Sequence, residues 1–314
     1  MSKNIIFQAF NWRLQDIKRE LPTIAEQGFN IIQTSPLQQH KEKDNPVWWL
    51  SYQITNFQIG NRLGSVSDLI ELCKEADKYG VKIIVDCVFN HTANANNNNY
   101  IPSEEVDYNI KSRQDFFLNN RRRIEDYNNR WQVVNWDIDL PSLNYNNEEY
   151  QNIAIDYLND LVACGVEGFR FDACRHIPTN TEYDKRYNCN SNFWERVLLH
   201  VNDRERLFIY GEILDSSTEV VDAYHTYMNT GVNNNSGTDK TKLVKWFLSH
   251  DDVLTFGISK DKYNKEVTIR EWDWLLKTNR ESSVLFYPFE FDDTWKCEEI
   301  KRINNIYNKY KKRN

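Results

Sequence analysis

The sequence predicts a closed barrel of eight parallel β-strands that alternate with α-helices, the (β/α)8 or TIM barrel. Short apolar runs typical of buried strands occur eight times along the 314 residues, and amphipathic helical patterns separate most of them. An open doubly wound sheet is the alternative, but the sequence has no glycine-rich phosphate loop after an early strand. Eight repeated units therefore favour the barrel.

The predicted strands are rich in Ile, Val and Phe. One of them contains GFRFD, in which Arg170 and Asp172 share one face and Phe169 and Phe171 the other, because side chains alternate along a strand. The face that carries Arg170 and Asp172 must therefore be either exposed to solvent or functional. In chain order, the eight predicted strands are residues 4–10, 29–35, 81–89, 166–172, 207–212, 222–228, 242–250 and 283–289.

Three early helices are predicted by apolar residues spaced three and four apart. Gly28, Gly80 and Gly165 follow them, and glycine suits the left-handed position just past a helix end. A last helix is expected at residues 294–311, where the basic end favours the helix dipole. The apolar positions are Leu14, Ile17, Leu21 and Ile24, then Leu69, Leu72, Cys73 and Ala76, then Ile153, Tyr157, Leu158 and Leu161.

One polar connection, residues 91–144, is too long for an ordinary loop in a compact domain. Its length predicts a lid or a small subdomain. We therefore expect a barrel formed by residues 1–90 and 145–314, with an inserted subdomain B at 91–144.

Composition argues against several classes of partner. The net charge is -7 and basic residues are dispersed except at the end, so we expect no nucleic-acid partner. No apolar run approaches 18 residues, so we expect no membrane span. The start shows no secretory signal and the six cysteines lack metal-ligand spacing, so we expect a reduced, intracellular, cytoplasmic protein.

Polar residues cluster where the predicted strands end, and in a barrel these ends meet at one functional face. Taken singly, an aspartate at such a position is more often a cap or an ion pair. Together, several buried like charges are costly and persist where chemistry needs them. Two or three carboxylates near aromatic side chains suit glycoside hydrolysis. The cluster comprises Asp86, Asn90, His91, Arg170, Asp172, Arg175, His176, Glu212, His250, Asp251 and Asp252.

Five motifs in order resemble those of the α-amylase family of retaining α-glycosidases, over nearly the whole chain. The motifs are DCVFNH (86–91), LPSLN (140–144), GFRFDACRH (168–176), YGEIL (210–214) and FLSHDD (247–252). The segment 48–64, WWLSYQITNFQIGNRLG, also resembles the family's sugar-binding loop. The motif sequences are most similar to those of bacterial α-amylases. The resemblance implies retaining cleavage of α-1,4-glucosidic bonds in glycogen, starch or maltodextrins through a covalent glucosyl-enzyme.

The resemblance also assigns catalytic roles. It makes Asp172 the nucleophile and Glu212 the general acid and base. It implies that Asp251 holds the 2- and 3-hydroxyls of the sugar and stabilises the distorted transition state. Arg170 would orient Asp172 and keep it ionised, and Asp86 would pair with Arg170.

Further residues would bind substrate by the same resemblance. His91 and His250 would hydrogen-bond the sugar at the cleavage position. Tyr52 would stack on that sugar, with Gln53 and Trp49 nearby. The acceptor side would be bordered by Arg175 and His176.

Two departures from the family pattern affect these expectations. The family's structural calcium would use Asn90 and the carbonyl of His176, but Ser142 stands where an aspartate is usual, which lowers the charge offered to a hard cation. Asp137 and Asp139 are the candidates to compensate, so the sequence leaves calcium open. We also expect the usual C-terminal β-domain to be absent, because the residues after the predicted last strand fit one helix.

The same residues would also serve transglycosylation or exo-cleavage, and product analysis must separate these. A third hypothesis is a glucan-binding protein that has no catalytic turnover. A missing nucleophile or acid would support it, and neither is missing.

Overall fold

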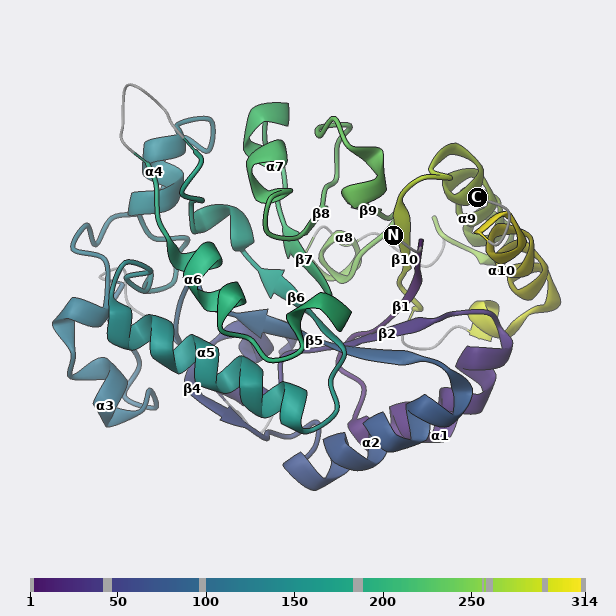
Figure 1. Cartoon of the computed structure of the whole chain (residues 1–314), viewed down its shortest axis with the longest axis horizontal. Helices are drawn as coiled ribbons and strands as arrows, with labels where there is room; N and C mark the ends of the chain where they lie inside the picture. The colour runs from purple at the N-terminus through teal and green to yellow at the C-terminus, as the bar shows by residue number, and fades with distance from the viewer. Residues whose placement is uncertain are drawn as a thin grey trace.

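Eight parallel strands close into the predicted barrel in a computed structural model (Figure 1). The structure describes residues 3–41, 47–95, 100–182, 189–255, 257, 262–289 and 293–311. Around the barrel the order is β1-β10-β9-β8-β7-β6-β5-β2, with parallel pairing throughout. The strands are β1 (Ile5–Ala9), β2 (Ile31–Thr34), β5 (Lys82–Val88), β6 (Gly168–Asp172), β7 (Phe208–Glu212), β8 (Asn229–Gly231), β9 (Leu243–Lys245) and β10 (Ser283–Phe286).

Helices cover the outside of the barrel and bury their apolar stripes against it. The predicted positions Leu14, Leu69 and Leu161 are fully buried, and Gly28, Gly80 and Gly165 have positive φ angles of 88°, 65° and 98°. Each of these glycines thus ends a helix as the sequence predicts. The main outer helices are α1 (Leu14–Glu26), α2 (Val66–Tyr79), α5 (Glu148–Ala163), α6 (Phe193–Leu199), α7 (Thr218–Tyr224), α9 (Lys265–Thr278) and α10 (Glu298–Lys311).

The strands divide their side chains between two cores. Phe169 and Phe171 point outward into the large core beneath the helices, whereas the inner face of the barrel carries a separate apolar cluster. Arg170 points inward beside that cluster, as the alternation in GFRFD predicts. The inner cluster consists of Ile6, Ile31, Ile84, Tyr210, Val244 and Leu285.

Two strand predictions are wrong in position. Residues 222–228 were expected to form a strand, but α7 runs through Tyr224 and the strand is only Asn229–Gly231. Ser217 caps α7 by accepting a hydrogen bond from the Val220 N–H, and the apolar residues of this segment are at helical spacing. A three-residue strand with two polar residues and a glycine carries no periodic signal of its own.

The seventh predicted strand, 242–250, is also shorter than expected. It ends at Lys245, and His250–Leu254 form a short helix, α8. Ser249 and Asp252 make a reciprocal capping box at its start, so Asp252 serves the helix end. His250 and Asp251 therefore lie at the mouth of the barrel on a helix, beyond the strand.

The described part of the connection 91–144 contains two short α-helices, α3 (Tyr108–Lys111) and α4 (Arg130–Asn135). Its ends meet, because the Leu143 N–H donates to the Asn90 carbonyl at 2.8 Å. A small antiparallel pair, β3 (Gln38–His40) and β4 (Ile54–Ile59), follows β2 and was not predicted. In Figure 1, α3 and α4 lie on the side of the barrel away from α9 and α10.

None of the helices in the described ranges combines the length and the apolar character needed to cross a membrane.

Candidate active site

Three carboxylates surround one buried guanidinium at the mouth of the barrel. Arg170 Nη1 donates to both oxygens of Asp86, at 2.9 and 2.8 Å, and to Asp172 Oδ1 at 2.8 Å. Its Nη2 donates to Glu212 Oε1. The residues come from β5, β6 and β7, and the parallel register pairs Asp86 with Arg170. The structure therefore brings together four residues that the sequence predicted to converge.

The charges of this group do not balance, since one arginine faces three carboxyl groups. Burial raises the pKa of Asp86 to about 7, against the opposing charge of Arg170. Burial also raises the pKa of Asp172, again opposed by Arg170. The pKa of Glu212 is raised by burial and, despite Arg170, further by the negative charge of Asp172. Of the latter two, Glu212 is therefore the better placed to keep a proton.

A hydrogen-bonded chain supports the group from the side of β1. Gln8 Nε2 lies 3.0 Å from His250 Nδ1, and the Tyr52 hydroxyl lies 3.0 Å from His250 Nε2. The same hydroxyl donates to Asp86 Oδ2 at 3.0 Å. Burial and the charge of Arg170 lower the pKa of His250 well below its ordinary value, so the ring is neutral. The chain links Gln8 to the carboxylate cluster through two rings.

Sequence reasoning missed Gln8. The available signal was a single polar side chain inside the apolar run NIIFQAF, on β1. Its amide is 4% exposed and meets His250 across the barrel, 242 residues away in sequence. A long-range contact of this kind follows from barrel closure and has no local pattern.

Asp251 lies beside this chain, with its Oδ2 3.6 Å from His250 Nε2. Burial and the charge of Glu212 raise the pKa of half-buried Asp251 to about 8. Asp251 and Glu212 both line one cavity of about 150 Å³. Its lining includes Gln8, Arg170, Glu212, Trp246, His250 and Asp251.

The remaining predicted sugar-binding residues support the segment that carries Tyr52. His91 Nε2 donates to the Tyr52 carbonyl at 3.0 Å, and burial lowers the pKa of His91 to about 4. Gln53 Oε1 accepts a hydrogen bond from the Asn94 N–H. Trp49 is half exposed, edge-on to Trp48. Of this set, Tyr52 makes the direct hydrogen bond to Asp86.

Arg175 and His176 lie in a 3-10 turn, η3 (Cys174–His176), just after β6. His176 Nδ1 donates to the Val133 carbonyl at 2.8 Å, and Arg175 Nη2 donates to the Tyr127 carbonyl at 3.0 Å. Burial and the charge of Arg175 lower the pKa of His176 to about 3. Both side chains therefore connect the end of β6 with the inserted segment.

The expected calcium ligands can be compared with the oxygens present. Asp137 Oδ1 accepts a hydrogen bond from the Ser142 N–H at 2.7 Å, while Asp137 Oδ2 and Ser142 Oγ are buried without a hydrogen-bond partner among the described residues. Burial raises the pKa of Asp137 to about 6. The described residues contain no cluster of three His, Cys, Asp or Glu side chains suited to a metal. Asp137 Oδ2 and Ser142 Oγ are thus two buried oxygens of the kind that a calcium ion binds, one from a carboxylate and one neutral.

Comparison with known proteins gives a consistent picture. Residues 12–279 match the family model described as "Alpha amylase, catalytic domain". The chain is 34% identical to an α-amylase of Clostridium acetobutylicum, over 97% of this chain and 43% of that protein. It is 26% identical to a pancreatic α-amylase of Rattus norvegicus, over 98% of this chain and 66% of that protein. The chain spans less than half the length of the first three curated relatives it matches.

Solved structures show the same fold. The α-amylase of Geobacillus thermoleovorans complexed with acarbose superimposes with a TM-score of 0.74 at 19% identity, covering 98% of this chain and 78% of that one. The α-amylase I of Eisenia fetida gives a TM-score of 0.75 at 20% identity, covering 97% and 77%.

Proposed function

We propose, from the premise that the chain belongs to the α-amylase family of glycoside hydrolases, that it cleaves α-1,4-glucosidic bonds of glycogen, starch or maltodextrins with retention. The supporting observation is the group of three carboxylates around Arg170, with Asp251 facing the same cavity as Glu212. Paired carboxyl groups of different proton affinity are what retaining glycosidases require.

In the first step, Asp172 attacks the anomeric carbon of the bound sugar. Its charge is supported by the 2.8 Å hydrogen bond from Arg170. Glu212 gives its proton to the glycosidic oxygen, so the leaving chain departs neutral with a free hydroxyl. The raised pKa of Glu212 suits this acid role. The product of the step is a glucosyl ester on Asp172.

In the second step, Glu212 removes a proton from water, which attacks the same carbon and releases Asp172. Asp251 binds the 2- and 3-hydroxyls of the distorted sugar. His250 and His91 are kept neutral by burial and hydrogen-bond the sugar, and Tyr52 stacks on the ring. Two inversions at the anomeric carbon give overall retention.

The remaining predicted binding residues have peripheral positions. The exposed Trp49 supplies a face for a neighbouring sugar, with Gln53 beside it. Arg175 and His176 border the acceptor side.

A structural calcium between barrel and insertion is part of this proposal. Asn90, Asp137 and Ser142 would hold it with the carbonyl of His176. The ion would add positive charge beside buried Asp137, whose pKa burial raises despite the charge of Arg121. After chelation, added Ca²⁺ should raise the melting temperature of the wild type by at least about 3 °C. Asp137→Asn should lose most of that gain, and an equal gain in both proteins would rule the site out.

Hydrolysis of a blocked maltoheptaoside tests the main proposal. Wild type should release α-anomeric products, as seen by NMR. Glu212→Gln should be slower by about 10²–10⁴-fold. Glu205→Gln, an exposed acid before β7, is the matched control and should keep full activity.

The products also separate the alternatives. Longer chains would indicate transglycosylation, and release of a single short product from the start would indicate exo-action. A folded wild type that binds maltodextrin without turnover would establish the glucan-binding alternative.

A further inference from the structure

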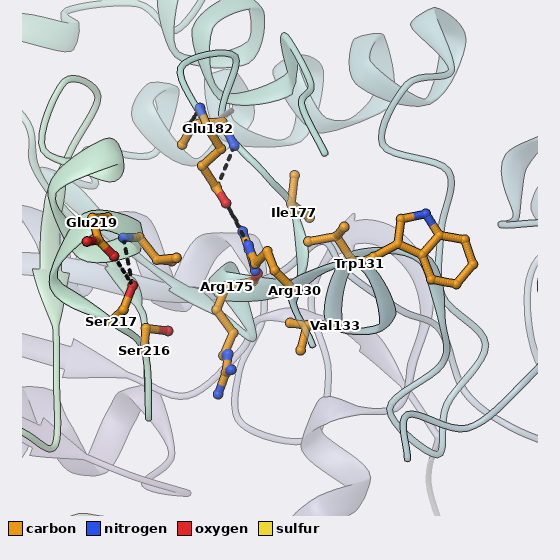
Figure 2. A network of polar contacts seen from close by, with 12 residues as sticks. Arg130, Trp131, Val133, Arg175, Ile177, Glu182, Ser216, Ser217 and Glu219 are labelled. Carbon is orange, nitrogen blue, oxygen red and sulfur yellow. Dashed lines mark hydrogen bonds and ion pairs between the residues drawn. The ribbon is translucent and has the colours of Figure 1, made fainter. Parts of the chain in front are cut away.

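A second buried arginine lies outside the catalytic group. Arg130, the first residue of α4, pairs with Glu182 through two parallel hydrogen bonds, Nε to Oε2 at 2.6 Å and Nη2 to Oε1 at 2.7 Å. The two side chains are 13% and 7% exposed. Figure 2 shows the Arg130 guanidinium directed at Glu182, while the Arg175 side chain points away from the pair. The pair joins the inserted segment to the chain after β6.

The rest of the Arg130 guanidinium meets the turn that follows β6. Its Nη1 donates to the Arg175 carbonyl, and its Nη2 lies 3.0 Å from the Tyr224 hydroxyl. That hydroxyl in turn donates to the Ile177 carbonyl at 2.7 Å. Arg130, Tyr224 and Glu182 thus form a clamp on this turn, and Glu182 also accepts the Thr179 N–H at 3.0 Å.

The clamped turn starts with a strained residue next to the predicted nucleophile. Ala173 has φ 46° and ψ 30°, a left-handed conformation that is costly for a residue with a Cβ. Its N–H donates to Glu212 Oε2 at 3.2 Å. Strain of this kind persists only where the surroundings hold the backbone in place. The contacts of Arg130 and Tyr224 hold the residues that follow it.

We propose that Arg130 is a positioning residue for the reaction, acting through the turn 173–177 on Asp172 and Glu212. The inference rests on the proposed hydrolase function. A guanidinium suits the task because its planar fork binds a carboxylate through two parallel hydrogen bonds and donates to a carbonyl as well, in a fixed geometry that a flexible ammonium group lacks. Arg130 itself touches neither Asp172 nor Glu212 in the hydrogen bonds of the described residues.

The test uses a double variant, Arg130→Met with Glu182→Gln, in which no buried charge is left alone. Glutamine keeps an acceptor for the Thr179 N–H. The matched control is Val134→Ala, a buried side chain on the same helix, which removes packing from α4 and keeps Arg130 and Glu182 intact. Arg130→Lys, which keeps the charge but loses the fork, is the conservative variant. Kinetics on the blocked maltoheptaoside are measured well below all melting temperatures.

The double variant should lose about 10- to 100-fold in kcat with KM changed less than about threefold, since small misplacements of reacting groups cost this much. Arg130→Lys should recover part of kcat. Val134→Ala should lower the melting temperature and keep kcat within about twofold of wild type. A folded double variant with wild-type kcat would overturn the proposal and leave the pair a purely structural tie.

Amide hydrogen exchange separates this proposal from the hydrolase function. If wild type shows no hydrolysis, the proposed function fails, and exchange in a peptide covering 173–177 decides the clamp on its own. That peptide should exchange about tenfold faster or more in the double variant than in Val134→Ala. Equal exchange in the two variants would refute the clamp.

Discussion

The two buried arginines, Arg170 and Arg130, differ in whether the acidic groups around them balance their charge. Arg170 faces Asp86, Asp172 and Glu212, so one positive charge meets three carboxyl groups. Arg130 meets one carboxylate and otherwise uncharged carbonyl and hydroxyl oxygens. The first group stores unfavourable electrostatic energy, whereas in the second the Arg130–Glu182 pair balances its own charges.

This difference separates chemistry from support. Unbalanced buried charge raises proton affinities and persists where a reaction uses it. A balanced, bidentate pair contributes geometry and costs stability mainly when one partner is removed. Removing one charged side chain should therefore have opposite effects on stability in the two places, and the following predictions test that contrast.

The largest effect is expected on activity at the unbalanced group. Asp172→Asn should lower kcat by at least about 10⁴-fold, because no other side chain can form the ester. Its melting temperature should equal or exceed that of wild type, since one of three crowded carboxyl groups can no longer ionise. Steady-state kinetics and thermal unfolding check both. Retention of more than about 1% of activity would refute the role of Asp172.

The next effect is on stability at the balanced pair. Arg130→Met alone leaves Glu182 buried without a counter-charge, so it should reduce the free energy of unfolding by about 3–5 kcal/mol. Denaturant titration measures this loss, and adding Glu182→Gln should restore a large part of it. If the single variant lost less than about 1 kcal/mol, the pair would be no more than a surface contact.

A smaller effect is expected from pH at the mouth. The pKa of Asp251 is raised to about 8 in the folded protein, so between about pH 4 and pH 8 the folded state holds a proton that the unfolded chain has released. Stability is therefore lost as pH rises through this range. Asp251→Asn should gain about 1 kcal/mol relative to wild type between pH 5 and pH 8, after allowance for partial exposure.

Denaturant titrations at both pH values measure that gain. The control Glu205→Gln should track wild type throughout. A gain in Asp251→Asn that is constant with pH, or that shrinks as pH rises, would contradict the assignment.

The balance of local and distant contacts explains what the sequence could predict. The alternation in GFRFD and the glycines after helices are local rules, and they located Arg170, Asp172 and the barrel units correctly. Asp86 and Glu212 converge on Arg170 because parallel register brings strand ends together. The position of β8 was missed, since three residues, Asn229–Gly231, carry no periodicity.

The support around the site depends on tertiary contacts that leave no spacing signal. In the sequence, Gln8 is only a single polar residue within an apolar strand. Its contact with His250 arises from closure of the barrel. Arg130 and Glu182 are 52 residues apart, in segments that read as polar and irregular. The motif correctly placed His250 and Asp251 at the mouth of the barrel, but the prediction put them on a strand. A five-residue helix is too short to show a helical periodicity in the sequence.

The smallest effect should come from an exposed ion pair of the same inserted segment. Arg122 Nη2 lies 2.9 Å from Glu125 Oε1, a distance close to those of the Arg130 pair, but the side chains are 59% and 60% exposed. Water already solvates both charges, so Glu125→Gln should change the free energy of unfolding by less than about 0.5 kcal/mol and leave kcat unchanged. Denaturant titration beside Arg130→Met gives the comparison directly. Equal losses would mean that exposure does not distinguish the pairs, and the argument from burial for the Arg130 clamp would fail with it.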